Sequence, residues 1–458
     1  MKFLKKVGVD NWVIIMMLLV ASITVKNLKR WYPGHVINYD VISYYHYLPS
    51  TFIYGSPTLD TPNEKYFKYE HVFWLIPLEN GGRVNKTSMG ISVLYAPFFF
   101  MGHAAAYLFD YDPSGFTTPY SFAIVLSSIF YFGLGMFFLR KVLRIYFSEA
   151  VTAITLVLIG LGTNLFYYVV MAPGYAHVYV FCMLAVLVYY LHKWYEEPKL
   201  GLTIFLGFLL GLMVLSRPTL ILVLPFAGLF GVRNWKDLKE RGNLLLKRYG
   251  KLLLMAFVAF LVWVPQFIYW KAATGSYLFF SYTGERFFWG DPKILEVLFG
   301  FRKGWLIYTP IMIFSLIGLA MMVRKKEKLA LAILVTFLLY LYTVSCWWDW
   351  WFGGSFGYRA LIDMFPLLAI GMAYFISKLL KYKMVLKTSI LSLMFLLMGY
   401  NLFQTRQSHE ALIHHDSMTW AAYKKIFLKL APSIYAWDLE PYLDHPDYDA
   451  ARRGERDQ

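Results

Sequence analysis

The chain has 458 residues and a formal net charge of +16; 59% of its residues are hydrophobic, 20% aromatic and 16% charged. Soluble proteins carry about 25% charged residues, so this composition excludes an ordinary soluble protein. Nucleic-acid binding is disfavoured, because most basic residues form short clusters between apolar stretches, as the orientation of membrane helices requires. The two cysteines, Cys182 and Cys346, provide neither a disulfide framework nor a zinc-type spacing.

The apolar stretches predict an all-α polytopic membrane protein with a bundle of about eleven transmembrane helices. Stretches of about 20 apolar residues are long enough to cross the hydrocarbon core as helices. The first stretch follows a basic start and lacks a small-residue cleavage site, so it is predicted to be an uncleaved span. The predicted spans lie near residues 10–27, 118–139, 150–170, 176–194, 200–215, 219–232, 251–270, 306–323, 329–345, 362–380 and 388–404.

One further apolar stretch, residues 90–109, is predicted to be an interfacial or re-entrant helix on the outer face. The basic clusters between spans all fall on the cytoplasmic side only if this stretch does not cross. Pro97 and His103 also make it a poor simple span. The N terminus is therefore predicted to be cytoplasmic, and residues 233–250 to form a basic amphipathic helix on the inner surface.

This layout predicts a transmembrane domain over residues 1–404 and an extracytoplasmic C-terminal segment over 405–458. The large outer loops are 28–117, which carries the interfacial helices, and 271–305. Most acids, histidines and aromatic clusters lie in the outward-facing segments, so the functional site is predicted there. The predicted spans carry no charged residue at their middle, which disfavours an ion-coupled transporter.

Asp40 is the candidate catalytic residue. It lies in the first outer loop within a polar and aromatic run, where partial burial by Tyr39, Tyr44 and Tyr45 is expected to suit a carboxylate to the role of general base. The competing interpretation is that Asp40 caps a helix beginning near Val41.

Three sequence motifs and their order resemble the GT-C glycosyltransferases over residues 10–380, and among them the bacterial relatives of protein O-mannosyltransferases (glycosyltransferase family 39) and lipid A aminoarabinose transferases. Asn38-Tyr39-Asp40 resembles that family's first-loop acidic motif. Lys86-Thr87-Ser88-Met89-Gly90 resembles the Lys-Pro-Pro-Leu segment before an interfacial helix. Ser216-Arg217-Pro218-Thr219 falls where relatives have a Lys-Gly-Pro hairpin.

The resemblance implies an enzyme of the bacterial inner membrane that takes a sugar from a polyprenyl-phosphate donor. It transfers the sugar with inversion to an extracytoplasmic glycan, lipid or protein. Many relatives have an Asp-Glu pair in the first loop, whereas Val41 follows Asp40 here, which leaves a divalent metal open as a cofactor. Glu70-His71 and His414-His415-Asp416 have metal-ligand residue types but lack the remaining ligands in sequence.

Three cations are candidates for binding the departing phosphate: Lys86, Arg217 and Arg359. Arg217 is isolated within apolar sequence, where the alternative is a side chain that snorkels to the membrane surface. Arg359 follows a glycine-rich run that allows close approach to a phosphate, and the alternative is a helical ion pair with Asp363. For Lys86 the alternative is an ordinary surface lysine.

Sugar or acceptor contacts are predicted for His177, Glu285, Arg286 and Asp349. His177 is alternatively a hydrogen-bonded histidine at the membrane interface, and the tryptophans around Asp349 are alternatively an aromatic belt. Two other classes of function stay open: a flippase or transporter of lipid-linked saccharides, and a catalytically inactive membrane scaffold.

Overall fold

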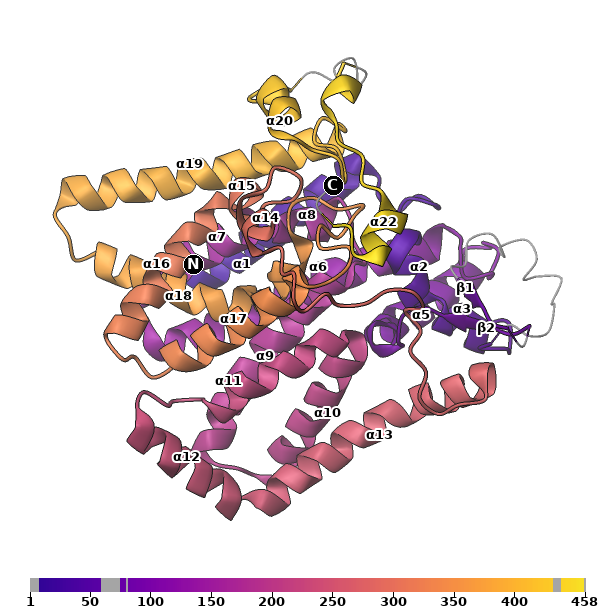
Figure 1. Cartoon of the computed structure of the whole chain (residues 1–458), viewed down its shortest axis with the longest axis horizontal. Helices are drawn as coiled ribbons and strands as arrows, with labels where there is room; N and C mark the ends of the chain where they lie inside the picture. Colours follow the sequence, from indigo (N-terminus) through magenta and orange to yellow (C-terminus); the bar gives the residue numbers. More distant parts are fainter. Residues whose placement is uncertain (1–7, 59–74, 80, 431–437, 457–458) are drawn as a thin grey trace.

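The computed structural model describes residues 8–58, 75–79, 81–430 and 438–456, and these residues are mainly helical (Figure 1). The predicted metal-ligand types Glu70 and His71 lie outside the described residues. The elements are α1 (Val9–Leu28), α2 (Tyr39–Tyr45), α3 (Tyr47–Phe52), β1 (Leu75–Pro77), β2 (Arg83–Asn85), α5 (Gly90–Leu108), α6 (Thr118–Tyr146), α7 (Glu149–Leu161), α8 (Leu165–Val170), α9 (Ala176–Glu196), α10 (Leu200–Ser216), η3 (Pro218–Val223), α11 (Leu224–Gly228), α12 (Trp235–Lys247), α13 (Tyr249–Thr274), α14 (Ile294–Phe299), α15 (Trp305–Tyr308), η4 (Pro310–Met312), α16 (Ile313–Arg324), α17 (Ala330–Ser345), η5 (Arg359–Met364), α18 (Phe365–Leu379), α19 (Met384–His409), α20 (Trp420–Ile426), η6 (Glu440–Tyr442) and α22 (Tyr448–Arg453).

The helices confirm an all-α polytopic membrane fold. Within the described residues, seven helices are long and apolar enough to cross a membrane, and five shorter apolar helices accompany them. Each predicted span coincides with one of these helices or with a broken pair of them. The span predicted over 150–170 is broken between α7 and α8, and the span over 306–323 is interrupted at Pro310, which lacks the N–H that a continuous helix needs.

The stretch that we expect to be interfacial forms a continuous helix, α5, despite the internal Pro97. By length and composition α5 also qualifies as a membrane span. Its placement at the outer surface therefore stays a prediction. Residues 235–247 form the expected amphipathic helix α12. The preceding residue, Asn234, caps this helix, because its side chain accepts a hydrogen bond from the Asp237 N–H at 2.9 Å.

Helix α18 and the preceding η5 form the buried centre of the bundle, whereas α13 and α19 are largely exposed and lie along opposite margins (Figure 1). Because the exposed faces of α13 and α19 are apolar, they are suited to contact lipid. Helices α16 and α18 approach closely at two glycines. A Cβ on Gly318 would lie 1.9 Å from the carbonyl oxygen of Gly371, so only glycine permits this packing.

The C-terminal segment folds back against the loops that follow α13 and α17. Arg456 is 1% exposed and donates hydrogen bonds to the carbonyl oxygens of Ser345 at 2.8 Å and Trp347 at 2.9 Å. These contacts attach the segment that contains α22 to the loop between α17 and η5.

Candidate active site

A cavity of about 880 Å³ lies where the segment between α1 and α6, the α10–η3 turn, the loops after α13 and α17, and the C-terminal segment meet. It brings together six of the eight predicted site residues, some of them separated by 319 positions in the chain. The six are Asp40, Lys86, Arg217, Glu285, Asp349 and Arg359.

Asp40 is held at the cavity by α2. The next two residues, Val41 and Ile42, are buried and fix this short helix against the bundle. The Asp40 carboxylate keeps 30% of its surface exposed, and its Oδ2 accepts a hydrogen bond from Nη1 of Arg359 at 2.7 Å. Asn38 is the N-cap residue of α2, and Asp40 lies in the first turn. The interpretation of Asp40 as a helix cap is therefore wrong.

Of the three tyrosines expected around Asp40, Tyr39 and Tyr44 line the cavity and Tyr45 does not. Tyr44 lines the cavity, and burial, followed by the charge of Asp40, raises the pKa of its phenol. The Tyr45 hydroxyl donates a hydrogen bond to the Gly115 carbonyl, and Tyr45 does not line the cavity. Tyr39 is 65% exposed. Tyr175, which the sequence did not indicate, supplies the second aromatic wall together with Tyr44.

Arg359 is positioned by the glycine-rich loop before η5. Gly357 has a φ of 58°, and a Cβ there would also lie 3.0 Å from the Cβ of Tyr308, so glycine is required at this bend. The Arg359 guanidinium faces the ring of Tyr175, 5.3 Å from its centroid. Its buried Nε has no hydrogen-bond partner among the described residues. Arg359 therefore keeps an unused donor.

Arg217 is held by a buried carboxylate and does not snorkel to the membrane surface. Its Nε lies 3.2 Å from Oδ2 of Asp363, which is fully buried. The same carboxylate accepts a hydrogen bond from the Tyr340 hydroxyl at 2.7 Å and contacts Nδ1 of His177 at 2.8 Å. Asp363 thus orients Arg217, while Arg359 pairs with Asp40, so the alternative of a helical Arg359–Asp363 pair is wrong.

Lys86 follows β2 and forms an ion pair with Glu285, whose side chain is 7% exposed. The preceding Asn85 is 1% exposed, and its amide donates a hydrogen bond to the Ser43 carbonyl at 2.6 Å. The Asn85 hydrogen bond holds Lys86 close to α2, and the ion pair holds Glu285 against Lys86. Lys86 is therefore an ion-paired residue of the cavity wall, in contrast to the alternative of a free surface lysine.

Two predicted sugar-contacting residues lie outside the cavity wall. His177 is 2% exposed and sits behind Arg217 in the hydrogen-bonded arrangement that was the competing interpretation. Arg286 is exposed; its Nη2 donates a hydrogen bond to the Arg453 carbonyl at 3.2 Å, and its guanidinium lies 4.7 Å from the ring centre of Phe288. Contact of Arg286 with sugar or acceptor stays a prediction, while the buried His177 is placed to orient Arg217.

Several wall residues were not anticipated from sequence. Tyr282 lies beside Lys86, whose amine is 5.3 Å from the Tyr282 ring centre, and burial raises the pKa of the Tyr282 phenol to about 12. Arg30 closes one side and donates a hydrogen bond to the Met171 carbonyl. The C-terminal segment contributes further wall residues, namely His415, Asp416, Tyr448 and Arg452. Of these residues, only His415 and Asp416 stand out in the sequence, as metal-ligand residue types.

Asp349 lies in the cavity wall between Trp348 and Trp350, and its carboxylate accepts a hydrogen bond from the Gly353 N–H at 3.1 Å. Burial raises the pKa of Asp349 to about 6, a shift that the Gly353 N–H and the Arg359 charge oppose. At neutral pH the cavity therefore holds Asp349 as an ionised carboxylate that can accept hydrogen bonds.

The raised pKa of Asp349 predicts a pH-dependent stability. Between pH 4 and 6, bounded by the ordinary value of 3.8 and the folded value of about 6, the folded protein binds more protons than the unfolded chain. The free energy of unfolding is thus expected to fall as pH rises through this window. In Asp349→Asn the fall should be smaller, so the variant should gain stability relative to wild type above pH 6. Denaturant unfolding in detergent at several pH values measures this, and parallel curves would contradict it.

The cavity residues do not fit a divalent metal beside Asp40. Within the part of the chain that the structure describes, no group of three histidine, cysteine, aspartate or glutamate ligands converges on this carboxylate. The carboxylate is paired with the Arg359 guanidinium.

The fold is that of a polytopic helical membrane protein with a cavity lined by charged and aromatic residues. The structure is similar to the archaeal oligosaccharyltransferase AglB from Archaeoglobus fulgidus in complex with an inhibitory peptide and a dolichol-phosphate, with a TM-score of 0.50, 10% identity, and coverage of 94% of this chain and 59% of that chain. At this identity the similarity shows the fold alone.

Two further solved structures are similar at a TM-score of 0.49. ArnT from Cupriavidus metallidurans in the apo state is 14% identical, over 81% of this chain and 60% of that chain. The A. fulgidus oligosaccharyltransferase tethered to an acceptor peptide with an NVT sequon is 11% identical, over 94% and 59%. The chain thus spans about three fifths of the length of these structures. No family model and no curated protein matches the sequence.

Proposed function

We propose that the protein is a membrane glycosyltransferase that moves a sugar from a polyprenyl-phosphate donor to an extracytoplasmic acceptor, with inversion at the anomeric carbon. The proposal depends above all on the pairing of Asp40 with Arg359 in a cavity that also contains Arg217 and Lys86. This combination of an accessible carboxylate with several cations suits a displacement in which a hydroxyl loses a proton and a phosphate leaves.

The residues divide the chemistry between them. The acceptor oxygen attacks the anomeric carbon and forms the new glycosidic bond, while the bond from that carbon to the phosphate oxygen breaks. Asp40 accepts the proton of the acceptor hydroxyl as general base. The phosphate departs with the electron pair of the broken bond, and Arg359 and Arg217 stabilise the negative charge that develops on it. Because attack and departure occur on opposite faces, the anomeric configuration inverts.

Donor binding also frees the base. Without a ligand, Asp40 and Arg359 neutralise each other at 2.7 Å. A donor phosphate offers Arg359 a second anion, because the Arg359 guanidinium lines the cavity and carries further N–H donors besides the one that binds Asp40. As Arg359 shifts its hydrogen bonds to phosphate, the Asp40 carboxylate becomes available to the acceptor hydroxyl.

A second cavity suits the apolar tail of such a donor. It measures about 540 Å³ and is lined mainly by apolar residues of α9, α10, α11 and α13. The two cavities share η3: Pro218 and Thr219 line the first, and Leu220 and Ile221 line the second. A molecule with a charged head and a hydrocarbon tail can therefore place each part against matching chemistry.

Sidedness and partners complete the proposal. The positive-inside distribution of basic clusters supports a cytoplasmic N terminus and a cavity that opens outside the inner membrane. The AglB structure contains a dolichol-phosphate and a peptide, which supports a lipid phosphate as the leaving group here. The acceptor is a glycan, a lipid or a protein, as the resemblance of the sequence motifs implies.

The test uses the full chain purified in detergent and a polyprenyl-phosphate hexose labelled in the sugar. Release of polyprenyl phosphate, with the label moving to an acceptor in inverted configuration, is expected; nuclear magnetic resonance reports the configuration. The same donor inside liposomes provides the contrasting measurement. Movement of intact donor across the bilayer without release of polyprenyl phosphate would overturn the proposal in favour of a flippase.

A further inference from the structure

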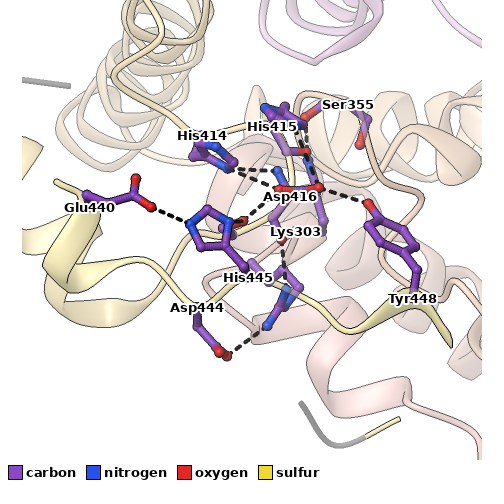
Figure 2. A network of polar contacts seen from close by, with 11 residues as sticks. Lys303, Ser355, His414, His415, Asp416, Glu440, Asp444, His445 and Tyr448 are labelled. Atoms are coloured by element: carbon purple, nitrogen blue, oxygen red, sulfur yellow. Dashed lines mark hydrogen bonds and ion pairs between the residues drawn. The ribbon is translucent and has the colours of Figure 1, made fainter. Parts of the chain in front are cut away.

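The C-terminal segment carries a cluster of metal-ligand residues at the rim of the cavity. His414, Asp416 and His445 each offer one ligand atom, and these three atoms lie within 4.8 Å of one another (Figure 2). His414 Nδ1 and Asp416 Oδ1 are 3.1 Å apart. Ligand atoms at zinc distances of about 2.0–2.1 Å in a tetrahedral arrangement lie about 3.4 Å apart, so this edge already has the required length.

His445 is oriented by a carboxylate outside the cluster. Its Nε2 lies 2.8 Å from Oε1 of Glu440 (Figure 2). A carboxylate that accepts the proton of one imidazole nitrogen fixes the tautomer and turns the lone pair of the other nitrogen toward a metal. Here the other nitrogen, Nδ1, lies 2.9 Å from Oγ of Ser417, on the side of Asp416.

The hydrogen bonds around Asp416 come from neighbouring hydroxyl groups. The Ser417 hydroxyl donates to Oδ1 of Asp416 at 2.6 Å, so it has no second proton for the His445 Nδ1 lone pair. The other carboxylate oxygen, Oδ2 of Asp416, accepts the Tyr448 hydroxyl at 2.8 Å. Two nearby cations bind other oxygens than those of the Asp416 carboxylate: Arg302 pairs with Asp444 at 2.8 Å and donates to the Asp416 carbonyl at 2.9 Å, and Lys303 donates to the carbonyls of Ser355 and His415.

We infer that His414, Asp416 and His445 bind a divalent transition-metal ion of the Zn²⁺ class. Two imidazoles and one carboxylate favour zinc over magnesium or calcium, which prefer all-oxygen sites. Three protein ligands leave the fourth position for Ser417 or water. The ion joins residues 414–416 to residue 445, and Tyr448, bonded to Asp416, lines the cavity. The metal therefore fastens the C-terminal segment beside the donor cavity.

Metal binding is tested directly on the full chain, purified in detergent without a polyhistidine tag and stripped with a chelator. After addition of Zn²⁺ and gel filtration, elemental analysis is expected to find about one zinc per chain in wild type. His414→Ala and His445→Ala should lose this zinc. His409→Ala is the matched control: it removes an exposed imidazole at the end of α19, outside both the ligand group and the cavity wall, and should keep the zinc.

A second measurement covers the possibility that a ligand variant folds poorly. Glu440→Gln leaves all three ligands in place and should weaken zinc binding about 10–100-fold, the range for a carboxylate that orients a ligating histidine. Zn²⁺ should also raise the melting temperature of wild type and His409→Ala, but not that of His445→Ala. Absence of zinc from wild type, or equal zinc in wild type and His445→Ala, would overturn the inference. Neither readout requires glycosyl transfer, so failure of the proposed function leaves this test intact.

Discussion

Replacing Asp40 with asparagine is expected to abolish sugar transfer while leaving the fold intact. Loss of a general base lowers turnover about 10²–10⁴-fold, because the acceptor hydroxyl then keeps its proton as it attacks. The asparagine oxygen still accepts the hydrogen bond that Arg359 donates to Oδ2 in wild type, which keeps the site assembled, but the buried guanidinium loses its counter-charge, so the melting temperature should fall while the fold persists. Release of polyprenyl phosphate under saturating donor measures the turnover.

The matched control is Asp112→Asn, which removes an exposed acid from the same outer loop and outside the cavity wall. This variant should retain wild-type turnover. Asp40→Asn with near-normal turnover would eliminate Asp40 as the base. Equal losses in both variants would instead point to a general effect of charge in the first loop.

Removing the carboxylate of Asp363 is expected to have the largest effect on stability. Asp363 is fully buried and faces Arg217, His177 and Tyr340. In Asp363→Ala the Arg217 guanidinium loses its counter-charge, and leaving a buried charge unpaired costs about 3–5 kcal/mol. Denaturant unfolding in detergent micelles measures the loss.

A double variant separates stability from catalysis. Asp363→Leu combined with Arg217→Met replaces both members of the ion pair by apolar groups and should regain much of the lost stability, because no unpaired charge remains. It should stay inactive, since the phosphate loses one of its cations. Glu410→Gln, which breaks the more exposed Arg406–Glu410 pair, is the control and should unfold close to wild type. An Asp363→Ala protein as stable as this control would show that Asp363 does not stabilise the buried network.

The helices could be predicted because hydropathy is a local property. Each of the eleven predicted spans contains helix, including the stretch over 251–270 within α13. The breaks were harder to place. The chain departs from a helix at residues 162–164 and near Pro310, and only the proline gives a recognisable signal.

The chemistry of the cavity was partly visible in residue type. Asp40 and Arg217 are unusual because each is a charged residue within apolar or aromatic sequence, and both line the cavity. Their partners were not visible. Asp40 pairs with Arg359 across 319 positions, and no spacing rule reaches that far.

The competing interpretation, a pair between Arg359 and Asp363, fails for a geometric reason. Four residues of an α-helix bring side chains to the same face, which is why a pair was the competing interpretation. Residues Arg359–Met364 instead form a 3-10 helix. With three residues per turn, positions four apart point about 120° away from each other. The Asp363 side chain therefore points to Arg217, whereas the Arg359 side chain points to Asp40.

The C-terminal histidines show the same limit. His414 and Asp416 are neighbours in sequence, but the third ligand candidate, His445, reaches them only because the segment folds back on itself. The contact between His445 and Glu440 depends on the turn that η6 forms, so the sequence does not indicate it.

The sequence by itself determined that this chain forms apolar helices and concentrates its acids and aromatic residues in particular loops. Those properties depend on the cost of placing polar groups in hydrocarbon, which each segment incurs alone. Only the tertiary structure decided which charge faces which: Asp40 with Arg359, and Asp363 with Arg217. A buried charge is stabilised by whichever opposite charge the packing brings within a few ångströms, and helix packing is a property of the whole bundle.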